Sequence, residues 1–391
     1  MPLITDNQRL NEICENLSQC EFITIDTEFL RDKTYYPKLC LIQVSGPDKK
    51  AYAIDPIEGD LDLTPLFDLL LNPDILKVLH AARQDLEIFY QLMGKVVHPF
   101  FDTQIAAMVC GYGDSVGYES LVRNIVNAQL DKSSQFTDWA RRPLSQKQID
   151  YALGDVTHLC DIYLHLAAKL EERGRTSWVF EEEAILEDPK TYQNIPEESW
   201  KRVKVKSPKP KMLAVLREVA AWRERRAQEK NIPRAWIMRD DTMADLAAQA
   251  PTDAKGLKKI RNIPGDMADK PSGKAILECI KKGLATPKDD MPVPVKKKPL
   301  QPQAAATADI LRMLLKVQCA DSEVATKLVA SKEDIEAIAM DNNADVPALK
   351  GWRREVFGED ALALKKGNLA IGLKNSNITK FKVTGDTGLH E

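Results

Sequence analysis

Two acidic residues stand two positions apart in the segment Asp26-Thr27-Glu28, directly after a short apolar run. That run, Phe22–Ile25, is typical of a buried strand. Because alternate residues of a strand lie on one face, both carboxylates should project the same way from its end. Two such charges are costly unless a cation lies between them, and Mg²⁺ and Mn²⁺ favour oxygen ligands. The pattern indicates a metal site. Asp26 capping a turn with Glu28 in solvent is the alternative.

Two further acids could complete such a site. Asp85 lies early in a predicted helix that follows a strand, and Asp155 lies inside a long helical pattern. Tyr151 is four residues before Asp155 and therefore on the same helix face. Taken singly, Asp85 could be a first-turn helix acid and Asp155 a surface charge. Taken together, the four carboxylates predict one shared metal site.

The elements that must position these residues are strands followed by helices. Apolar and β-branched runs predict three more strands, and a turn at residues 45–47 separates the first two of them. Spacings of three and four residues predict a helix around Leu86 and a long helix over about residues 145–171, with Ser145 as its cap. The predicted strands are Cys40–Val44, Ala51–Ile54 and Leu76–Leu79. This order predicts a mixed sheet covered by helices.

Composition limits the class of protein. The chain has 391 residues and a net charge of −3, which favours two or three domains of roughly 100–200 residues each. The seven cysteines form no Cys-x-x-Cys pair, so we expect reduced thiols and no zinc cluster. The N-terminal residues do not follow the pattern of a secretory signal, and no stretch approaches the ~20 apolar residues of a membrane span. We therefore expect a cytoplasmic protein without a membrane partner.

Three long segments resemble, in order, the motifs of the ribonuclease D family of DEDD 3′→5′ exonucleases. They are ITIDTEFLRDKTYYPKLCLIQVS (23–45), HAARQDLEIF (80–89) and LDKSSQFTDWARRPLSQKQIDYALGDVTHL (130–159), with FDTQIAA (101–107) before the third. The spacing from Tyr151 to Asp155 matches the tyrosine subclass. Several long motifs in one order are more specific than any single acid.

The resemblance implies a ribonuclease H-like fold and two divalent metal ions, Mg²⁺ or Mn²⁺. The implied metal ligands are Asp26, Glu28, Asp85 and Asp155, and Tyr151 would orient the attacking water. Two metals ~3.5–4 Å apart can activate that water and stabilise the departing 3′ oxygen. The expected product is a nucleoside 5′-monophosphate.

Neighbouring residues are candidates for RNA contacts. Phe29, Tyr35 and Tyr36 could stack on terminal bases, or they could pack in the core or at its rim. A second group could contact phosphate or lie in a solvated loop, namely Lys132, Gln135 and Arg141. We interpret His80 as a hydrogen-bonded strand-end histidine rather than a ligand.

A helical block behind the nuclease resembles the HRDC domain, a small nucleic-acid-binding module. Trp222, Pro233, Asp241 and Leu246 match that family's pattern. Residues 201–234 contain twelve basic and three acidic residues, a net +9, which suits phosphate binding. A solubilising linker with a charged helix face would also explain this balance. The candidate contacts in the block are Arg223, Arg226, Lys258 and Lys259.

The predicted fold class is multidomain, α/β plus all-α. A mixed-sheet exonuclease domain is followed by two small helical HRDC-type domains, the second suggested by ALKGWRREVFGEDALALKKG (348–367). Pro- and Lys-rich stretches predict the linkers. The predicted bounds are exonuclease 1–190, linker 191–210, HRDC domain 211–286, linker 287–304, second HRDC-like domain 305–375 and tail 376–391.

These features together predict a 3′→5′ exoribonuclease. The resemblance implies trimming of tRNA precursors and other structured RNAs that have single-stranded 3′ ends, with a monomer as the default state. A non-catalytic RNA-binding adaptor is one alternative, but it predicts a missing carboxylate. A DNA-directed exonuclease is another, and the sequence does not locate the 2′-hydroxyl contacts that would exclude it.

Overall fold

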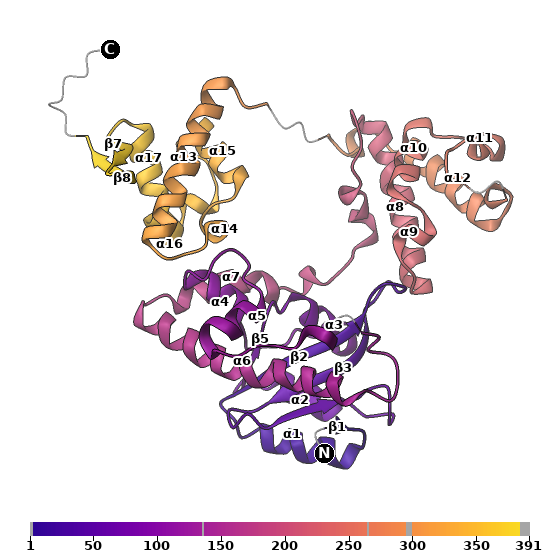
Figure 1. Cartoon of the computed structure of the whole chain (residues 1–391). Coiled ribbons are helices and arrows are strands. Elements are labelled where there is room, and N and C mark those ends of the chain that lie inside the picture. The colour runs from indigo at the N-terminus through magenta and orange to yellow at the C-terminus, as the bar shows by residue number, and fades with distance from the viewer. Residues whose placement is uncertain (1–2, 135–136, 264–265, 295–298, 384–391) are drawn as a thin grey trace.

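The computed structural model describes residues 3–134, 137–263, 266–294 and 299–383. They form an α/β domain followed by two mainly helical domains (Figure 1). The α/β domain is built on a six-stranded sheet in the order β1-β4-β3-β2-β5-β6. Its strands are β1 (Leu3–Ile4), β2 (Phe22–Leu30), β3 (Lys38–Ser45), β4 (Ala51–Ile54), β5 (Leu76–Leu79) and β6 (Phe100–Asp102).

The sheet is mixed, as predicted. β3 is antiparallel to both β2 and β4, whereas the other neighbours are parallel. The antiparallel pair β3–β4 turns at the Ser45–Pro47 segment that the sequence indicates. The edge strands β1 and β6 were not predicted, because two and three residues are too few to show an alternating pattern.

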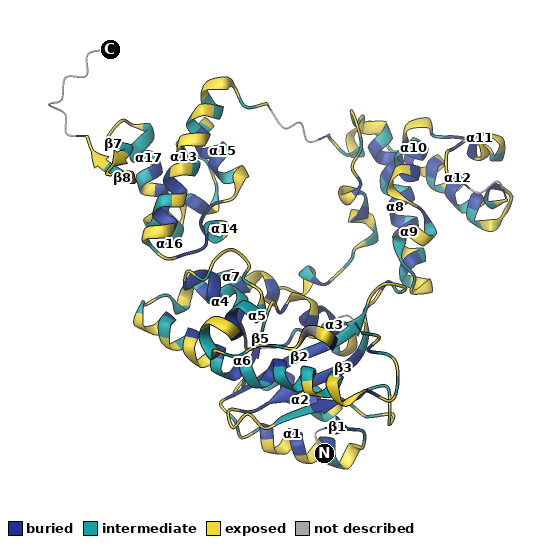
Figure 2. Cartoon of the chain, in the orientation of Figure 1, coloured by how far each residue is buried: buried dark blue, intermediate teal, exposed yellow. Residues whose placement is uncertain are grey.

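Helices cover both faces of this sheet, and their inner sides are buried (Figure 2). One hydrophobic core joins α1, α2 and α3 to one face, and another joins α4, α6 and α7 to the opposite face. The helices of the domain are α1 (Asn7–Leu17), α2 (Thr64–Leu71), α3 (Arg83–Met93), α4 (Thr103–Val109), α5 (Tyr118–Leu121), α6 (Gln146–Glu172) and α7 (Thr176–Glu187).

β2 is longer than the sequence predicts. The apolar run ends at Ile25, but the strand continues through Leu30 because β3 pairs with it as far as Leu30. β5 pairs with β2 only from Phe22 to Thr24. One edge of β2 is therefore not covered by β5 where the polar residues begin, and side chains of other elements can approach it there.

The long helix predicted over residues 145–171 is confirmed as α6. Ser145 caps it through a capping box with Gln148, which satisfies backbone N–H groups of the first turn. The hydroxyl of Thr24 on β2 donates to the backbone oxygen of Val156, at 2.8 Å. This buried contact fixes the middle of α6 against β2.

A second domain contains α8 (Pro210–Lys230), α9 (Arg234–Ile237), α10 (Asp240–Gln249), α11 (Ala254–Lys258) and α12 (Pro271–Leu284). The prediction of a linker over 191–210 was wrong in part. Residues Pro196–Arg202 form a 3₁₀ helix that packs on α8, and Trp200 and Val203 join the domain's core. The many lysines concealed these apolar residues.

The third domain consists of α13 (Pro302–Asp321), α14 (Thr326–Val329), α15 (Lys332–Met340), α16 (Gly351–Arg353) and α17 (Glu359–Lys365), followed by a hairpin of β7 (Leu369–Lys374) and β8 (Asn377–Lys382). The hairpin corrects the predicted all-helical domain and the tail at 376, because β8 pairs with β7 along its length. No helix among the described residues has the length and apolarity needed to cross a bilayer.

Candidate metal centre

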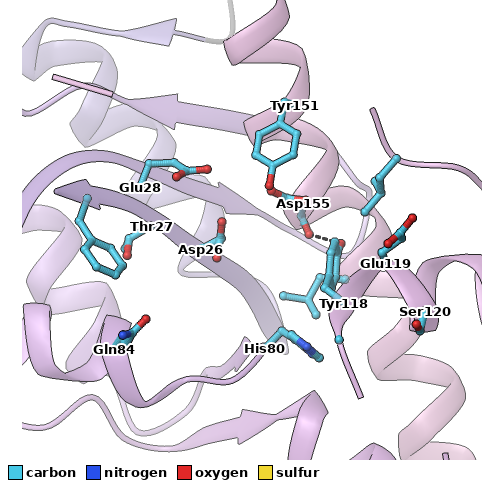
Figure 3. Close-up of a pocket in the computed structure, with 14 residues that line it drawn as sticks. Asp26, Thr27, Glu28, His80, Gln84, Tyr118, Glu119, Ser120, Tyr151 and Asp155 are labelled. Atoms are coloured by element: carbon cyan, nitrogen blue, oxygen red, sulfur yellow. Dashed lines mark hydrogen bonds between the residues drawn. The ribbon is translucent and has the colours of Figure 1, made fainter. Parts of the chain in front are cut away.

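Three of the four predicted carboxylates lie together at the surface between β2 and α6. Asp26, Glu28 and Asp155 each offer an oxygen, and these atoms all lie within 4.8 Å of one another. Figure 3 shows the three side chains converging from the strand and the helix. Asp26 and Glu28 share the face of β2 that carries Thr24, and Thr24 contacts α6. The strand alternation predicted from the sequence therefore directs both acids toward Asp155.

Tyr151 lies one helical turn before Asp155 on α6 and is hydrogen-bonded to its side chain. The Tyr151 ring lies 6.1 Å from the ring of Trp139, which is buried. The hydroxyl thus reaches the carboxylate cluster, and the ring lies against the buried Trp139. Figure 3 shows this hydroxyl beside Asp155.

Asp85 is not part of the three-residue group. It lies in the first turn of α3 and accepts a hydrogen bond from the Thr27 hydroxyl. Thr27 occupies the opposite face of β2 from Asp26 and Glu28. Asp85 therefore approaches β2 from the α3 side, and its charge is close enough to raise the pKa of Glu28. The structure places it beside the group rather than within it.

The electrostatics of the cluster favour a bound cation. Burial raises the pKa of Asp26, of Asp85 and of Asp155, and repulsion from Asp155 raises that of Asp26 further. For Glu28, burial and the three neighbouring carboxylates raise the pKa to about 10. One oxygen of Asp155 is buried without a hydrogen-bond partner among the described residues. Carboxylate oxygens that repel one another, one of them buried without a hydrogen-bond donor in the described part of the chain, are suited to bind a divalent cation.

The carboxylates line a cavity of about 550 Å³. Its wall also contains residues that the sequence interpretation missed, because they are far from the motifs or lack charge. These are Gln84, Gly117, Tyr118, Glu119, Ser120, Leu130 and Leu159. Tyr118 donates its hydroxyl hydrogen to the backbone oxygen of Asp155. No spacing rule connects two residues 37 positions apart, so the sequence contains no signal for this contact.

His80 lines the same cavity but has a hydrogen-bond partner. Its Nδ1 lies 3.0 Å from the hydroxyl oxygen of Thr103, and that hydroxyl donates to the Leu79 backbone oxygen. Nδ1 is therefore the protonated nitrogen. Burial lowers the pKa of His80 to about 4, so the ring is neutral at pH 7. These contacts agree with the interpretation of His80 as a hydrogen-bonded histidine.

The three aromatic residues predicted to stack on bases lie in different environments. Phe29 lines the cavity. Tyr36 is 37% exposed. The prediction for Tyr35 was wrong, because its ring is buried and its hydroxyl donates to Glu224 of α8, while the guanidinium of Arg234 lies 4.6 Å from the ring centre. Tyr35 therefore joins the nuclease to the second domain.

The loop candidates lie before α6. Lys132 begins a short 3₁₀ helix, Lys132–Ser134, and Gln135 lies outside the described residues. Arg141 is exposed. Its neighbour Arg142 has a structural role, since it forms an ion pair with the buried Asp55 at 2.6 Å.

The basic candidates of the second domain differ in their exposure and in their ion-pair partners. Arg223 is 4% exposed and donates to the Met238 backbone oxygen and to Asp240, and its assignment as an RNA contact stays a prediction. Arg226 pairs with Glu229 on the same helix, and Lys258 pairs with Asp269. Lys259 is exposed.

Two protein-family models match the chain. A 3′-5′ exonuclease model matches residues 1–171, and the HRDC domain model matches residues 212–280. The predicted exonuclease domain followed by a helical HRDC domain is therefore confirmed. The assignment of the third domain as a second HRDC-like module stays a prediction.

Curated relatives extend the similarity over the whole chain. A ribonuclease D of Nitrobacter hamburgensis is 45% identical and covers 98% of this chain and 100% of its own length. A ribonuclease D of Sphingobium indicum is 44% identical and covers 96% of this chain and 97% of its own length. The crystal structure of Escherichia coli RNase D superposes with a TM-score of 0.79 at 29% identity, covering 93% of this chain and 98% of that one. The chain belongs to the ribonuclease D family of 3′→5′ exoribonucleases.

Proposed function

We propose that this protein removes 3′-terminal nucleotides from RNA by hydrolysis at the site formed by Asp26, Glu28, Asp155 and Tyr151, with Asp85 beside them. The observation that supports this most directly is the convergence of three carboxylates within 4.8 Å next to a tyrosine hydroxyl. Two divalent metal ions, Mg²⁺ or Mn²⁺, would activate a water and stabilise the departing 3′ oxygen when bound.

The protein's own residues have distinct roles in this proposal. Asp26, Glu28 and Asp155 would hold the cations with oxygen atoms that α6 and β2 already bring together. Asp85 would add a fourth carboxylate from the α3 side. Tyr151 would orient the attacking water, because burial and the carboxylates raise its pKa above the usual value and the hydroxyl therefore keeps its proton.

The cavity supports a single-stranded 3′ end as the substrate. Its volume of about 550 Å³ is typical of a pocket for one small ligand, so one terminal nucleotide would enter while a duplex would remain outside. Phe29 in the wall could stack on the terminal base, since such stacking tolerates any base. The E. coli neighbour is described as an exoribonuclease involved in structured RNA processing, and we propose 3′ maturation of tRNA precursors for this protein.

A paired assay tests the proposal. A 5′-labelled RNA with a single-stranded 3′ tail is incubated with wild type, with Asp26→Ala and with Asp150→Ala, in Mg²⁺, in Mn²⁺ and in EDTA. Asp150 is an exposed acid on α6 directly before Tyr151, and its variant serves as the matched control. With either metal ion, we expect a ladder of shortened products and release of nucleoside 5′-monophosphates from wild type and from the control, but not from Asp26→Ala. In EDTA, we expect no shortening by any of the three proteins.

The same assay separates the alternatives. If the matched DNA is shortened as fast as the RNA, the protein is a general exonuclease and the RNA-specific part of the proposal fails. If wild type binds the RNA but leaves it intact with either metal ion, the protein is a binding adaptor.

A further inference from the structure

A second cavity, of about 490 Å³, lies in the second domain and is rich in arginine. We call it the arginine cavity. Its wall consists of Ser199, Arg202, Arg223, Glu224, Arg234, Ala235, Arg239 and Asp240. The cavity lies between the 3₁₀ helix Pro196–Arg202 and the junctions of α8, α9 and α10. None of the residues that we assign to hydrolysis lines this cavity.

The charges of this wall do not cancel. Arg234 pairs with Glu224, and Arg223 pairs with Asp240, both at 2.6 Å. These two pairs account for both acids of the wall. Arg202 donates to the neutral side-chain oxygen of Asn194, at 2.8 Å, and its charge helps to lower the pKa of Glu224.

The positive charge of Arg239 is only weakly neutralised by its neighbour. Its contact with Asp241 is 3.5 Å long, and both side chains are largely exposed, so the pair is weak. Two guanidinium groups therefore add positive charge at the cavity. Guanidinium groups recognise phosphate through paired N–H donors.

An exposed tryptophan adjoins this charge. Trp236 directly follows Ala235 of the cavity wall, and it is 62% exposed. A single exposed apolar side chain needs no explanation. An exposed indole next in sequence to a wall that contains arginines is, however, a combination suited to single-stranded nucleic acid, with a base on the ring and the backbone on the cations.

The arginine cavity is joined to the nuclease by the loop between β2 and β3. Tyr35 of this loop contacts Glu224 and Arg234, which also line the cavity. The side chain of Asn231 at the end of α8 accepts the backbone N–H groups of Tyr35 and Tyr36, at 3.1 and 3.0 Å. Figure 1 shows this end of α8 beside the nuclease domain. The loop begins directly after the strand that carries Asp26 and Glu28, so it connects the carboxylate cluster to the domain that contains the cavity.

We propose that the arginine cavity binds a backbone phosphate of the RNA strand, upstream of the nucleotide in the metal centre, and that Trp236 stacks on an adjacent base. This inference rests on the proposed function in taking RNA as the ligand. It assigns Arg202, Arg239 and Trp236 to substrate binding and not to hydrolysis.

Equilibrium binding in EDTA tests the inference without hydrolysis. The probe is a fluorescein-labelled 12-nucleotide oligoadenylate, and the variants are Trp236→Ala, Trp236→Phe and the double variant Arg202→Gln/Arg239→Gln. We expect Kd to rise about tenfold for Trp236→Ala and to recover with phenylalanine. For the double variant, the slope of log K against log salt should fall by about 0.7 per lost phosphate contact. The controls are Phe180→Ala, an aromatic that is 53% exposed on α7, and Arg312→Gln in the third domain.

A kinetic ratio distinguishes a lost binding site from a damaged nuclease. The value of kcat/KM for the 12-mer, divided by that for a diribonucleotide, should fall about tenfold in Trp236→Ala and stay at the wild-type ratio in both controls. Variants that bind the 12-mer as wild type does would overturn the inference and leave the proposed function intact. Tryptophan-dependent binding by a wild type that hydrolyses nothing would uphold the inference and overturn the proposed function.

Discussion

The carboxylates at β2 and α6 repel one another in the absence of a cation, so the residues that would permit catalysis also destabilise the fold. Burial raises the pKa of Asp26, and repulsion from Asp155 adds to it. Active sites commonly trade stability for function in this way. The same charges should make the folded protein more stable when a divalent ion binds, because the ion binds the native state and not the unfolded chain.

Asp26→Asn tests this trade directly. Burial raises the pKa of Asp26 to about 8, so the test is made at pH 9, where the carboxylate is charged. Removing this charge should raise the free energy of unfolding in EDTA by about 1–2 kcal/mol, while hydrolysis falls about 100-fold. Mg²⁺ should raise the melting temperature of wild type more than that of the variant. Calorimetry with and without Mg²⁺ measures the stability of both proteins in both conditions. The control is Asp150→Asn, and a variant less stable than wild type in EDTA would contradict the repulsion.

Tyr151→Phe removes the hydroxyl while the ring stays packed against Trp139. We expect kcat to fall by about 100-fold, the scale of loss that follows misplacement of a reacting group, with little change in KM or stability. Steady-state kinetics on a single-stranded RNA measures this split. Tyr112→Phe is the control, since that hydroxyl contacts His165 at the surface. An equal loss in both variants would show that the hydroxyl is not specific to the reaction.

The sequence could predict that Asp26, Glu28 and Asp155 lie together because the signals are local. Asp26 and Glu28 share a strand face, and Tyr151 and Asp155 share a helix face. Tyr35 was misassigned, and the burial of Arg223 was not predicted, because their partners cannot be read from nearby sequence. The Tyr35 hydroxyl contacts Glu224, 189 residues later, and nothing near Arg223 in the sequence shows that tertiary packing buries it.

Among helices and strands, too, those with a clear local signal were predicted and others were missed. α6 was predicted almost to the residue, because its apolar spacing is long and Ser145 marks its start. The hairpin β7–β8 was missed although a signal exists. Asn375 and Ser376 both have positive φ and form the two-residue turn that asparagine favours, between alternating residues. The preceding helical pattern concealed this signal.

Glu183 connects α7 to the start of α4 and gives an element-scale prediction about pH. Its side chain is 1% exposed and accepts the backbone N–H of Asp102, at 2.5 Å. Burial raises its pKa from the usual 4.5 to about 9. Between these values the folded state holds a proton that the unfolded chain releases, so wild-type stability should fall as the pH rises through this window.

Glu183→Gln should remove this loss, because the amide oxygen can still accept the N–H and does not titrate. Relative to wild type, the variant should gain stability from pH 5 to pH 9, with a slope of up to about 1.4 kcal/mol per pH unit. Urea unfolding at three pH values measures the difference. Glu187→Gln, a half-exposed position on the same helix, is the control. Parallel curves for Glu183→Gln and wild type would contradict the prediction.

At the scale of the whole molecule, the nuclease contacts both helical domains. Tyr35 joins it to the second. Trp178 of α7 stacks on Trp352 of the third domain with ring centres 4.2 Å apart, and Arg353 pairs with Glu181 and Glu182. The sequence does not predict either contact, since the partners lie more than a hundred residues apart. These contacts fix the positions of both helical domains relative to the carboxylate cluster.

A glycine pair tests the contact with the third domain. Gly111 and Gly113 both have positive φ, but a Cβ on Gly111 would lie 2.7 Å from the Glu323 backbone oxygen, whereas one on Gly113 would meet nothing within 4 Å. Alanine should strain both positions by about 1 kcal/mol, and Gly111→Ala should in addition push the third domain away. Small-angle X-ray scattering should then show a larger radius of gyration for Gly111→Ala than for Gly113→Ala. Identical scattering from the two variants would mean that α14 and its flanking loop yield to the methyl group without undocking.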